Sequence, residues 1–136
     1  MNLHLPVASD DKSLAPTHFD PHAHLRRIPN DGRYAVVAEY QTTCPSMVGV
    51  IRIRADDPAD AWERHDAGDE LLVVLSGRVT MEVRLRSGSL QSFGLGAGEV
   101  LLVPANTPHS GRAVTPEAEV LFVTPRRGNH EWSEEA

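Results

Sequence analysis

Hydrophobic and polar residues alternate along much of this chain with a period of two. The alternation is clearest over residues 78–86, where apolar side chains take every second position, at Val79, Met81, Val83 and Leu85. Over residues 47–54, Ile51 and Ile53 alternate with arginines in the same way. A period of two places successive side chains on opposite faces of an extended strand. The pattern therefore predicts half-exposed antiparallel strands.

Short segments of this kind recur at spacings of about 8–12 residues, separated by turns rich in Gly, Pro, Asn and Asp. We expect strands at Tyr34–Gln41, Met47–Arg54, Trp62–His65, Glu70–Ser76, Arg78–Arg86, Leu90–Leu95, Val100–Val103, His109–Val114 and Glu119–Thr124. Glu70–Ser76 is apolar on both faces, so it should be a central, covered strand. No stretch of ten or more residues follows a 3.6-residue period. The predicted fold class is all-β, a sandwich or a barrel.

Length and composition limit the alternatives. The chain has 136 residues, 40% hydrophobic and 24% charged, which suits one globular domain. Its net charge of -6 argues against nucleic acid as a partner, because binding phosphates requires a basic face. Cys44 is the only cysteine, so neither an internal disulfide nor a cysteine-based zinc site is expected. No apolar run is long enough to span a membrane, and the N-terminus lacks an apolar signal core, so we expect a cytoplasmic protein.

One stretch, residues 62–77, combines strand patterning with metal-binding residue types. Glu63 and His65 are two positions apart and share a face of an extended segment. Asp66–Asp69 is a turn sequence, and Glu70 opens the next strand. A strand, a tight turn and a second strand would let these three side chains converge. An imidazole with carboxylates is a ligand set for a divalent metal.

A second stretch, residues 98–109, offers a further ligand. Gly98 predicts a turn, Val100–Val103 a short buried strand, and Pro104–Pro108 another turn with Asn106 at its centre. His109 then begins the next strand. A histidine arriving from a strand that is remote in sequence would complete a closed metal site in a barrel.

Together the two stretches resemble the paired motifs of the cupin superfamily, and in particular those of small single-domain cupins. The first motif is matched by Glu63-x-His65, four residues, Glu70, six residues and Gly77. The second is matched by Gly98, five residues, Pro104-x-Asn106, two residues and His109. The chain departs from these motifs at four positions. Asp57 and Asn106 stand where glycines are usual, Glu63 where the first histidine is usual, and Ala113 where an asparagine is usual.

The resemblance covers roughly residues 34–124 and implies a double-stranded β-helix, the jelly-roll barrel of the cupins. On that basis we expect an irregular N-terminal arm at 1–33, a barrel domain at 34–125 and a C-terminal tail at 126–136. An open sheet edge needs covering, so we expect a homodimer with a contribution from the arm or from Tyr34–Gln41.

The predicted site is one divalent metal ion bound by Glu63, His65, Glu70 and His109. These ligand types suit Fe, Mn, Zn, Ni or Co and do not discriminate among them. Glu63 has two alternative roles: a hydrogen bond to a ligating imidazole, or acceptance of a proton from a substrate. The resemblance implies a small-molecule substrate and a dioxygenase-like or isomerase-like reaction. The alternative is a non-catalytic protein that binds or senses a small ligand.

Two other groups of residues bear on this choice. His18, His22 and His24 form a histidine-rich cluster in the arm, and we expect these to be surface or packing residues. A sugar-phosphate isomerase would need a cation facing into the barrel, and Arg52 and Arg54 are the candidates.

Overall fold

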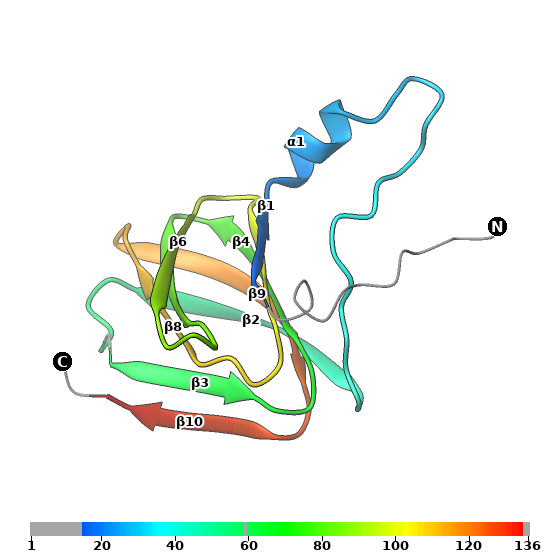
Figure 1. The fold of residues 1–136 in the computed structure, drawn as a ribbon. Helices are drawn as coiled ribbons and strands as arrows, with labels where there is room; N and C mark the ends of the chain where they lie inside the picture. The colour runs from blue at the N-terminus through cyan, green and yellow to red at the C-terminus, as the bar shows by residue number, and fades with distance from the viewer. Residues whose placement is uncertain (1–14, 59, 135–136) are drawn as a thin grey trace.

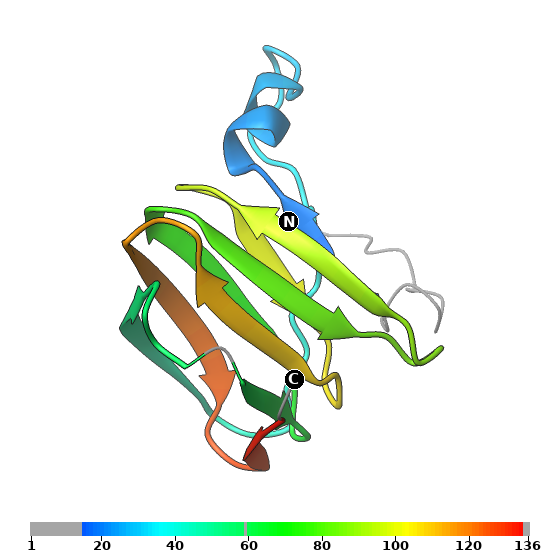
Figure 2. The same ribbon diagram turned by 90° about the vertical axis from the view of Figure 1, so that its left-hand side faces the viewer.

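Two five-stranded antiparallel sheets face each other in the computed structural model, which describes residues 15–58 and 60–134 (Figures 1 and 2). The strand order is β1-β7-β4-β9-β2 in one sheet and β10-β3-β8-β5-β6 in the other. The elements are β1 (Thr17–Phe19), α1 (Pro21–Arg26), β2 (Ser46–Arg54), β3 (Ala61–His65), β4 (Glu70–Ser76), β5 (Val79–Arg84), β6 (Leu90–Leu95), β7 (Val100–Val103), β8 (His109–Ala113), β9 (Glu117–Pro125) and β10 (Asn129–Ser133). This arrangement confirms the all-β jelly-roll fold.

The core lies between the two sheets and is built from the inward side of the period-two pattern. Val79, Met81 and Val83 of β5 are buried, and the residues between them are only partly so. From the other sheet, Leu72 and Val74 of β4 enter the same hydrophobic cluster. Burial of apolar surface of this kind is the main driving force for folding. The pattern thus fixes which face of each strand lines the barrel.

β4 is a central strand, as its sequence predicts. It pairs with β7 on one side and with β9 on the other. Leu71 and Val73 face away from the barrel, where Leu71 lies opposite Leu102 and Val123 and Val73 lies opposite Val100 and Leu121. The outer face of this sheet is therefore apolar as well. Such a face needs cover from another part of the chain or from a partner.

The predicted strand at Tyr34–Gln41 is wrong, because these residues form no strand. Their sequence is rich in strand-forming residues, but no neighbouring strand pairs with them among the described residues. Strand propensity mostly reflects packing against such neighbours. The chain from Phe19 to Tyr40 instead arches beside the outer face of the sheet (Figure 1). It leaves an open groove of about 500 Å³, lined by apolar side chains that include Ile28, Leu71 and Leu102.

The two terminal segments contain more regular structure than the sequence predicts. In the arm, β1 pairs with β7, and α1 begins at Pro21 with Asp20 as its N-cap. The carboxylate of Asp20 accepts a hydrogen bond from the His22 backbone N–H at 3.0 Å, as N-cap residues commonly do. In the tail, β10 pairs with β3 over five residues. Both termini therefore contribute edge strands to the sheets.

The helix content does not include a membrane span. Within the described part of the chain, no helix is both long and apolar enough to cross a bilayer. The one α-helix assigned there, α1, has six residues.

Candidate metal centre

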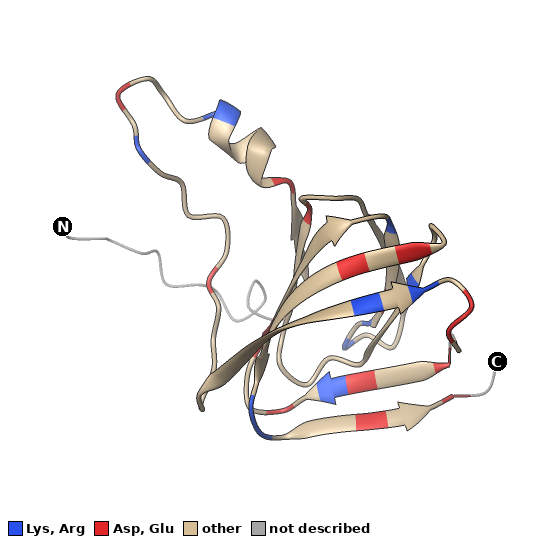
Figure 3. Cartoon of the chain, turned by 180° about the vertical axis from the view of Figure 1, so that it is seen from behind, with Lys and Arg blue, Asp and Glu red and all other residues tan. Residues whose placement is uncertain are grey.

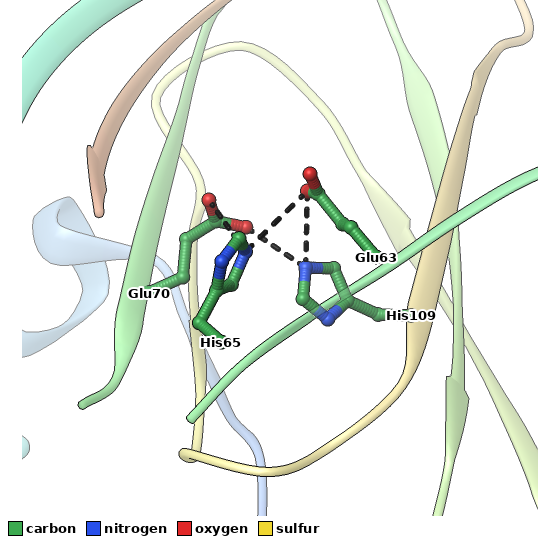
Figure 4. Close-up of side chains that lie close together, drawn as sticks. All are labelled: Glu63, His65, Glu70 and His109. Carbon is green, nitrogen blue, oxygen red and sulfur yellow. Dashed lines mark hydrogen bonds and ion pairs between the residues drawn. The ribbon is translucent and has the colours of Figure 1, made fainter. Parts of the chain in front are cut away.

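The four residues predicted to bind metal converge inside the barrel (Figure 4). Glu63 and His65 lie on β3, Glu70 is the first residue of β4, and His109 is the first residue of β8. Glu63 and His109 are directly opposite each other in the pairing of β3 with β8. One ligand atom from each residue can be chosen so that all four atoms lie within 4.8 Å of one another.

Two turns bring these strand ends together. Asp69, in the turn before Glu70, accepts hydrogen bonds from the backbone N–H groups of Gln41 and Ala105, each at 3.0 Å. Asn106 has a φ of 62° and donates its backbone N–H to the carbonyl of His65 at 2.8 Å. Asn adopts a positive φ more readily than most residues, so it serves where glycine is usual. The turn that leads to His109 is thereby attached to the strand that carries His65.

The Glu70 carboxylate lies between the two imidazoles. Its Oε1 is 2.9 Å from His109 Nε2, and its Oε2 is 3.2 Å from His65 Nε2. Glu63 Oε1 is 3.1 Å from His109 Nε2 and 3.7 Å from His65 Nε2. The two imidazole rings are 5.2 Å apart between centroids. Both histidines therefore direct Nε2 at the same small region between the carboxylates.

Burial differs among the four residues in a way that gives the site an open side. His65, Glu70 and His109 are buried, whereas the Glu63 side chain is 37% exposed. His65 Nε2 is buried and has no hydrogen-bond partner among the described residues, despite the nearby carboxylates. A buried polar atom without a partner is costly. A metal ion between these nitrogens and oxygens would give that atom a partner, so the residues present fit a divalent metal.

In the absence of metal, the cluster stabilises protonated imidazoles beside ionised carboxylates. Burial opposes the charged form of His65, but the negative carboxylates of Glu63 and Glu70 beside it outweigh burial and raise the pKa of His65 to about 10. The same balance raises the pKa of His109 to about 9. Burial also acts against ionisation of Glu63 and Glu70, yet the two histidines hold the pKa of each carboxyl below its usual value. Metal binding must displace protons from both imidazoles.

Three residues absent from the predicted site support it. Thr124 on β9 donates its hydroxyl to Glu70 Oε2 at 2.6 Å. The carbonyl of Thr107 lies 2.8 Å from His109 Nδ1, and Asn129 Oδ1 lies 2.8 Å from His65 Nδ1. Thr124 had one signal in the sequence: it is a polar residue at an inward position of an apolar strand. The Asn129 contact depends on the pairing of two distant strands, and the Thr107 contact is made by a backbone carbonyl that any residue would supply, so neither has a comparable signal in the sequence.

The histidines of the arm are not part of this group. Among the described residues, the only cluster with metal-ligand spacing is the one formed by Glu63, His65, Glu70 and His109. His18 is instead 2.9 Å from Glu99, and its ring meets the edge of Phe93. The ring of His24 packs against Phe19. Packing and surface contacts account for these two residues.

The two candidate phosphate-binding arginines lie outside the barrel. Arg52 and Arg54 are on the edge strand β2, where their side chains are 54% and 58% exposed. Both pair with Glu117, and Arg52 also pairs with Glu119. Figure 3 shows these charges side by side on β2 and β9. They are therefore not available to bind a phosphate at the metal centre.

The sequence model of the cupin domain matches residues 49–125, which is more than half of the chain. The chain belongs to the cupin family. Residues 49–125 of this cupin include most of β2, all of β3 to β9 and all four candidate ligands, whereas β1, α1 and β10 lie outside the match. No curated protein sequence matches the chain significantly.

Solved structures similar to this cupin include two enzymes. One is oxalate decarboxylase from Bacillus subtilis, 18% identical with a TM-score of 0.54, over 67% of this chain and 24% of that one. The other is hydroxypropylphosphonic acid epoxidase from S. wedmorenis, 27% identical with a TM-score of 0.50, over 58% of this chain and 42% of that one. The matches thus span about a quarter and two-fifths of those enzymes, and the first supports the fold alone.

Proposed function

We propose that this cupin binds one divalent metal ion through Glu63, His65, Glu70 and His109 and acts there on a small organic molecule. The observation that carries the proposal is the convergence of two buried imidazole nitrogens and two carboxylates within 4.8 Å. Two nitrogen and two oxygen donors suit Fe, Mn, Zn, Ni or Co. A metal of this kind supplies Lewis acidity and, if it is redox-active, electron transfer.

The surroundings of the site favour a dioxygenase-like reaction over a sugar-phosphate isomerase. Val83 lies directly opposite His109, and Val103 lies opposite Glu70. Both valines are buried in the core. Arg52 and Arg54 are occupied on the outer surface, so they offer no phosphate site at the metal. The similarity to the epoxidase also supports oxidative chemistry on a small organic molecule.

Glu63 is the residue best placed to handle a proton. Its side chain is partly exposed, whereas the other three are buried. The histidines hold the pKa of its carboxyl low, so Glu63 is ionised at neutral pH and can accept a proton or bind the metal directly. The buried Glu70, held by Thr124 and between both histidines, has the more fixed position.

Metal analysis of protein purified without chelators or a nickel column tests the site. We expect about one divalent ion per chain, lost in His65→Ala and His109→Ala. Stoichiometric metal with unchanged affinity in both variants would contradict the proposal. Ser92→Ala is a suitable control, because Ser92 is exposed on β6 and lies opposite Glu82, which is on the outward side of β5.

A second measurement tests whether a bound metal keeps a position open for oxygen, which a dioxygenase-like reaction requires and a non-catalytic ligand-binding protein does not. Nitric oxide mimics oxygen and gives a characteristic paramagnetic resonance signal when it binds Fe(II). We expect this signal from the anaerobic Fe(II)-loaded protein, because the Glu63 side of the site is open. Full iron loading without a nitrosyl signal would favour the non-catalytic alternative.

We also propose that the protein is a homodimer that buries the outer face of the β1-β7-β4-β9-β2 sheet. β2 is an edge strand in the described chain, and its outward Val48 and Val50 are 69% and 72% exposed. They continue the apolar rows through Val123 and Leu121. An apolar sheet face that reaches an open edge is a self-complementary surface for a two-fold partner.

Light scattering checks the oligomeric state. We expect the wild-type protein to be a dimer at micromolar concentration. The double variant Val48→Thr, Val50→Thr keeps strand-forming residues but removes the apolar surface, so it should shift toward monomer. A wild-type monomer at high micromolar concentration would contradict the dimer.

A further inference from the structure

Asn129, the first residue of β10, reaches the imidazole of His65 across the strand pair. The two residues are directly opposite in the antiparallel pairing of β10 with β3. Asn129 Oδ1 lies 2.8 Å from His65 Nδ1, and Asn129 Nδ2 donates to the carbonyl of Pro125 at 3.0 Å. The reverse orientation of the amide would place two acceptor oxygens, Asn129 Oδ1 and Pro125 O, against each other. The amide oxygen therefore faces His65 and requires a proton on Nδ1.

This contact determines which nitrogen of a neutral His65 is free to bind a metal. A neutral imidazole carries one proton, so protonated Nδ1 leaves a lone pair on Nε2. Nε2 is the buried atom that lacks a hydrogen-bond partner and faces the carboxylates of the site. His109 is prepared in the same way, through the Thr107 carbonyl at 2.8 Å from its Nδ1. Of the two histidines, His65 is the one whose tautomer depends on a side chain.

The backbone holds Asn129 in place for this role. Gly128 has a φ of 74°, and its carbonyl accepts the backbone N–H of Asp66 at 2.9 Å. The turn between β9 and β10 is thus attached to the residue that follows His65. Pro125, which accepts the other end of the Asn129 amide, is the last residue of β9 and is buried. Both contacts of the amide are therefore made to fixed parts of the barrel.

We propose that Asn129 is a positioning residue that holds His65 in the Nδ1-protonated form and so directs Nε2 at the metal. The inference rests on the proposed metal site. It gives the C-terminal strand, which lies beyond the family match, a part in metal binding. Hydrogen bonds of this kind fix ring orientation and raise the basicity of the ligating nitrogen.

Zinc affinity of three variants tests this role, measured by competition with a chromophoric chelator. Asn129→Ala removes the acceptor and should weaken zinc binding about 10- to 100-fold. Asn129→Asp keeps an acceptor for His65 Nδ1 but loses the donor to Pro125, and it should retain affinity within about threefold of wild type. Ser133→Ala, an exposed position on the same strand, is the matched control and should not change affinity.

Nitrogen NMR of the zinc-loaded proteins adds a readout that a purely structural role would not change. The wild type and Asn129→Asp should show a protected proton on His65 Nδ1, and Asn129→Ala should lose it to exchange with water. Thermal unfolding of the metal-free variants reports any loosening of β10. Equal loss of affinity in Asn129→Ala and Asn129→Asp would overturn the role, because only the contact with Pro125 would then matter.

Two negative outcomes are distinguishable. No zinc binding by the wild-type protein would overturn the metal site and this role with it. Unchanged affinity and a protected His65 Nδ1 proton in Asn129→Ala, beside a wild type that binds zinc, would overturn the role of Asn129 alone.

Discussion

Thr124 and Glu70 lie on adjacent strands of one sheet, and the Thr124 hydroxyl donates to Glu70 Oε2 at 2.6 Å. Both side chains are buried, so water cannot replace this hydrogen bond. The same oxygen is 3.2 Å from His65 Nε2, while the other carboxylate oxygen is 2.9 Å from His109 Nε2. Thr124 thereby fixes the rotation of a carboxylate that contacts both histidines.

Replacing Thr124 by Val should weaken metal binding by about 10- to 100-fold, the range for partners of metal ligands. Val has nearly the same shape but no hydroxyl, so Glu70 Oε2 loses its donor. The metal-free protein should also lose about 1–3 kcal/mol of unfolding free energy. Chelator competition and urea unfolding provide the two measurements. Thr124→Ser keeps the hydroxyl and should restore most of the affinity; equal loss in both variants would implicate the methyl group instead.

Conversion of each glutamate to glutamine should separate their roles. Glu70→Gln retains the shape but removes the charge beside two buried histidines, so metal affinity should fall strongly. Glu63→Gln should cost about 10- to 100-fold if Glu63 only orients an imidazole, and more if it binds the metal. Affinities from the same chelator assay decide between these. A larger loss for Glu63→Gln than for Glu70→Gln would reverse the relative importance assigned to the two residues.

The metal-free protein should be most stable in mildly acidic solution. The pKa values of His65 and His109 are raised from 6.5 to about 10 and about 9. The two histidines therefore contribute fully to the free energy of unfolding below pH 6.5, and this contribution is lost as the pH rises through 9 and 10. The carboxyl pKa values of Glu63 and Glu70 are lowered from 4.5. Their contribution to the free energy of unfolding is therefore complete above pH 4.5 and is lost in acid. Thermal unfolding across pH 4–10 in a chelating buffer measures this. His109→Ala should flatten the alkaline decline, and stability that rises from pH 7 to pH 9 would contradict the assignment.

The sequence predicts correctly those features that follow from the order of a few neighbouring residues. Glu63 and His65 must share a face of one strand, and the Gly68 turn returns the chain at Glu70, so three site residues follow from residues 62–77. His109 required the likeness between the second stretch and a known motif. Leu90–Leu95 and Val100–Val103 were predicted with the bounds that the structure has.

The errors arise where structure depends on distant partners. Tyr34–Gln41 has the residues of a strand, but no edge pairs with it within the described chain. Asn129 lies in a charged tail that local reasoning treats as irregular, yet β10 pairs with β3 and places it opposite His65. Strand pairing between segments more than 60 residues apart leaves no periodic signal at either end.

Gly77, which ends the first motif, should tolerate alanine poorly. Its φ is 76°, and an added Cβ would lie 2.5 Å from the Glu117 carbonyl oxygen and 2.7 Å from Thr115 Oγ1. Gly77→Ala should therefore combine backbone strain with a clash and cost about 3 kcal/mol or more. Gly88→Ala is the matched control, because its φ is 91° but nothing lies within 4 Å of the added Cβ. Its cost should be about 1–2 kcal/mol. If urea unfolding gives the two variants equal losses of unfolding free energy, the close approach to Glu117 of β9 adds nothing to the cost.

Zinc binding should release about two protons per chain at pH 7. With pKa values of about 10 and about 9, both His65 and His109 are protonated at that pH in the metal-free protein. Each must lose its Nε2 proton to bind a metal, whereas Glu63 and Glu70 are already ionised and release none. Calorimetry in buffers of different ionisation enthalpy counts the protons, and the number should fall toward zero as pH passes 10. His65→Gln, if it still binds zinc weakly, should release one proton fewer. Binding without proton release at pH 7 would mean that the imidazoles are neutral before the metal arrives, and that the carboxylates do not hold them charged.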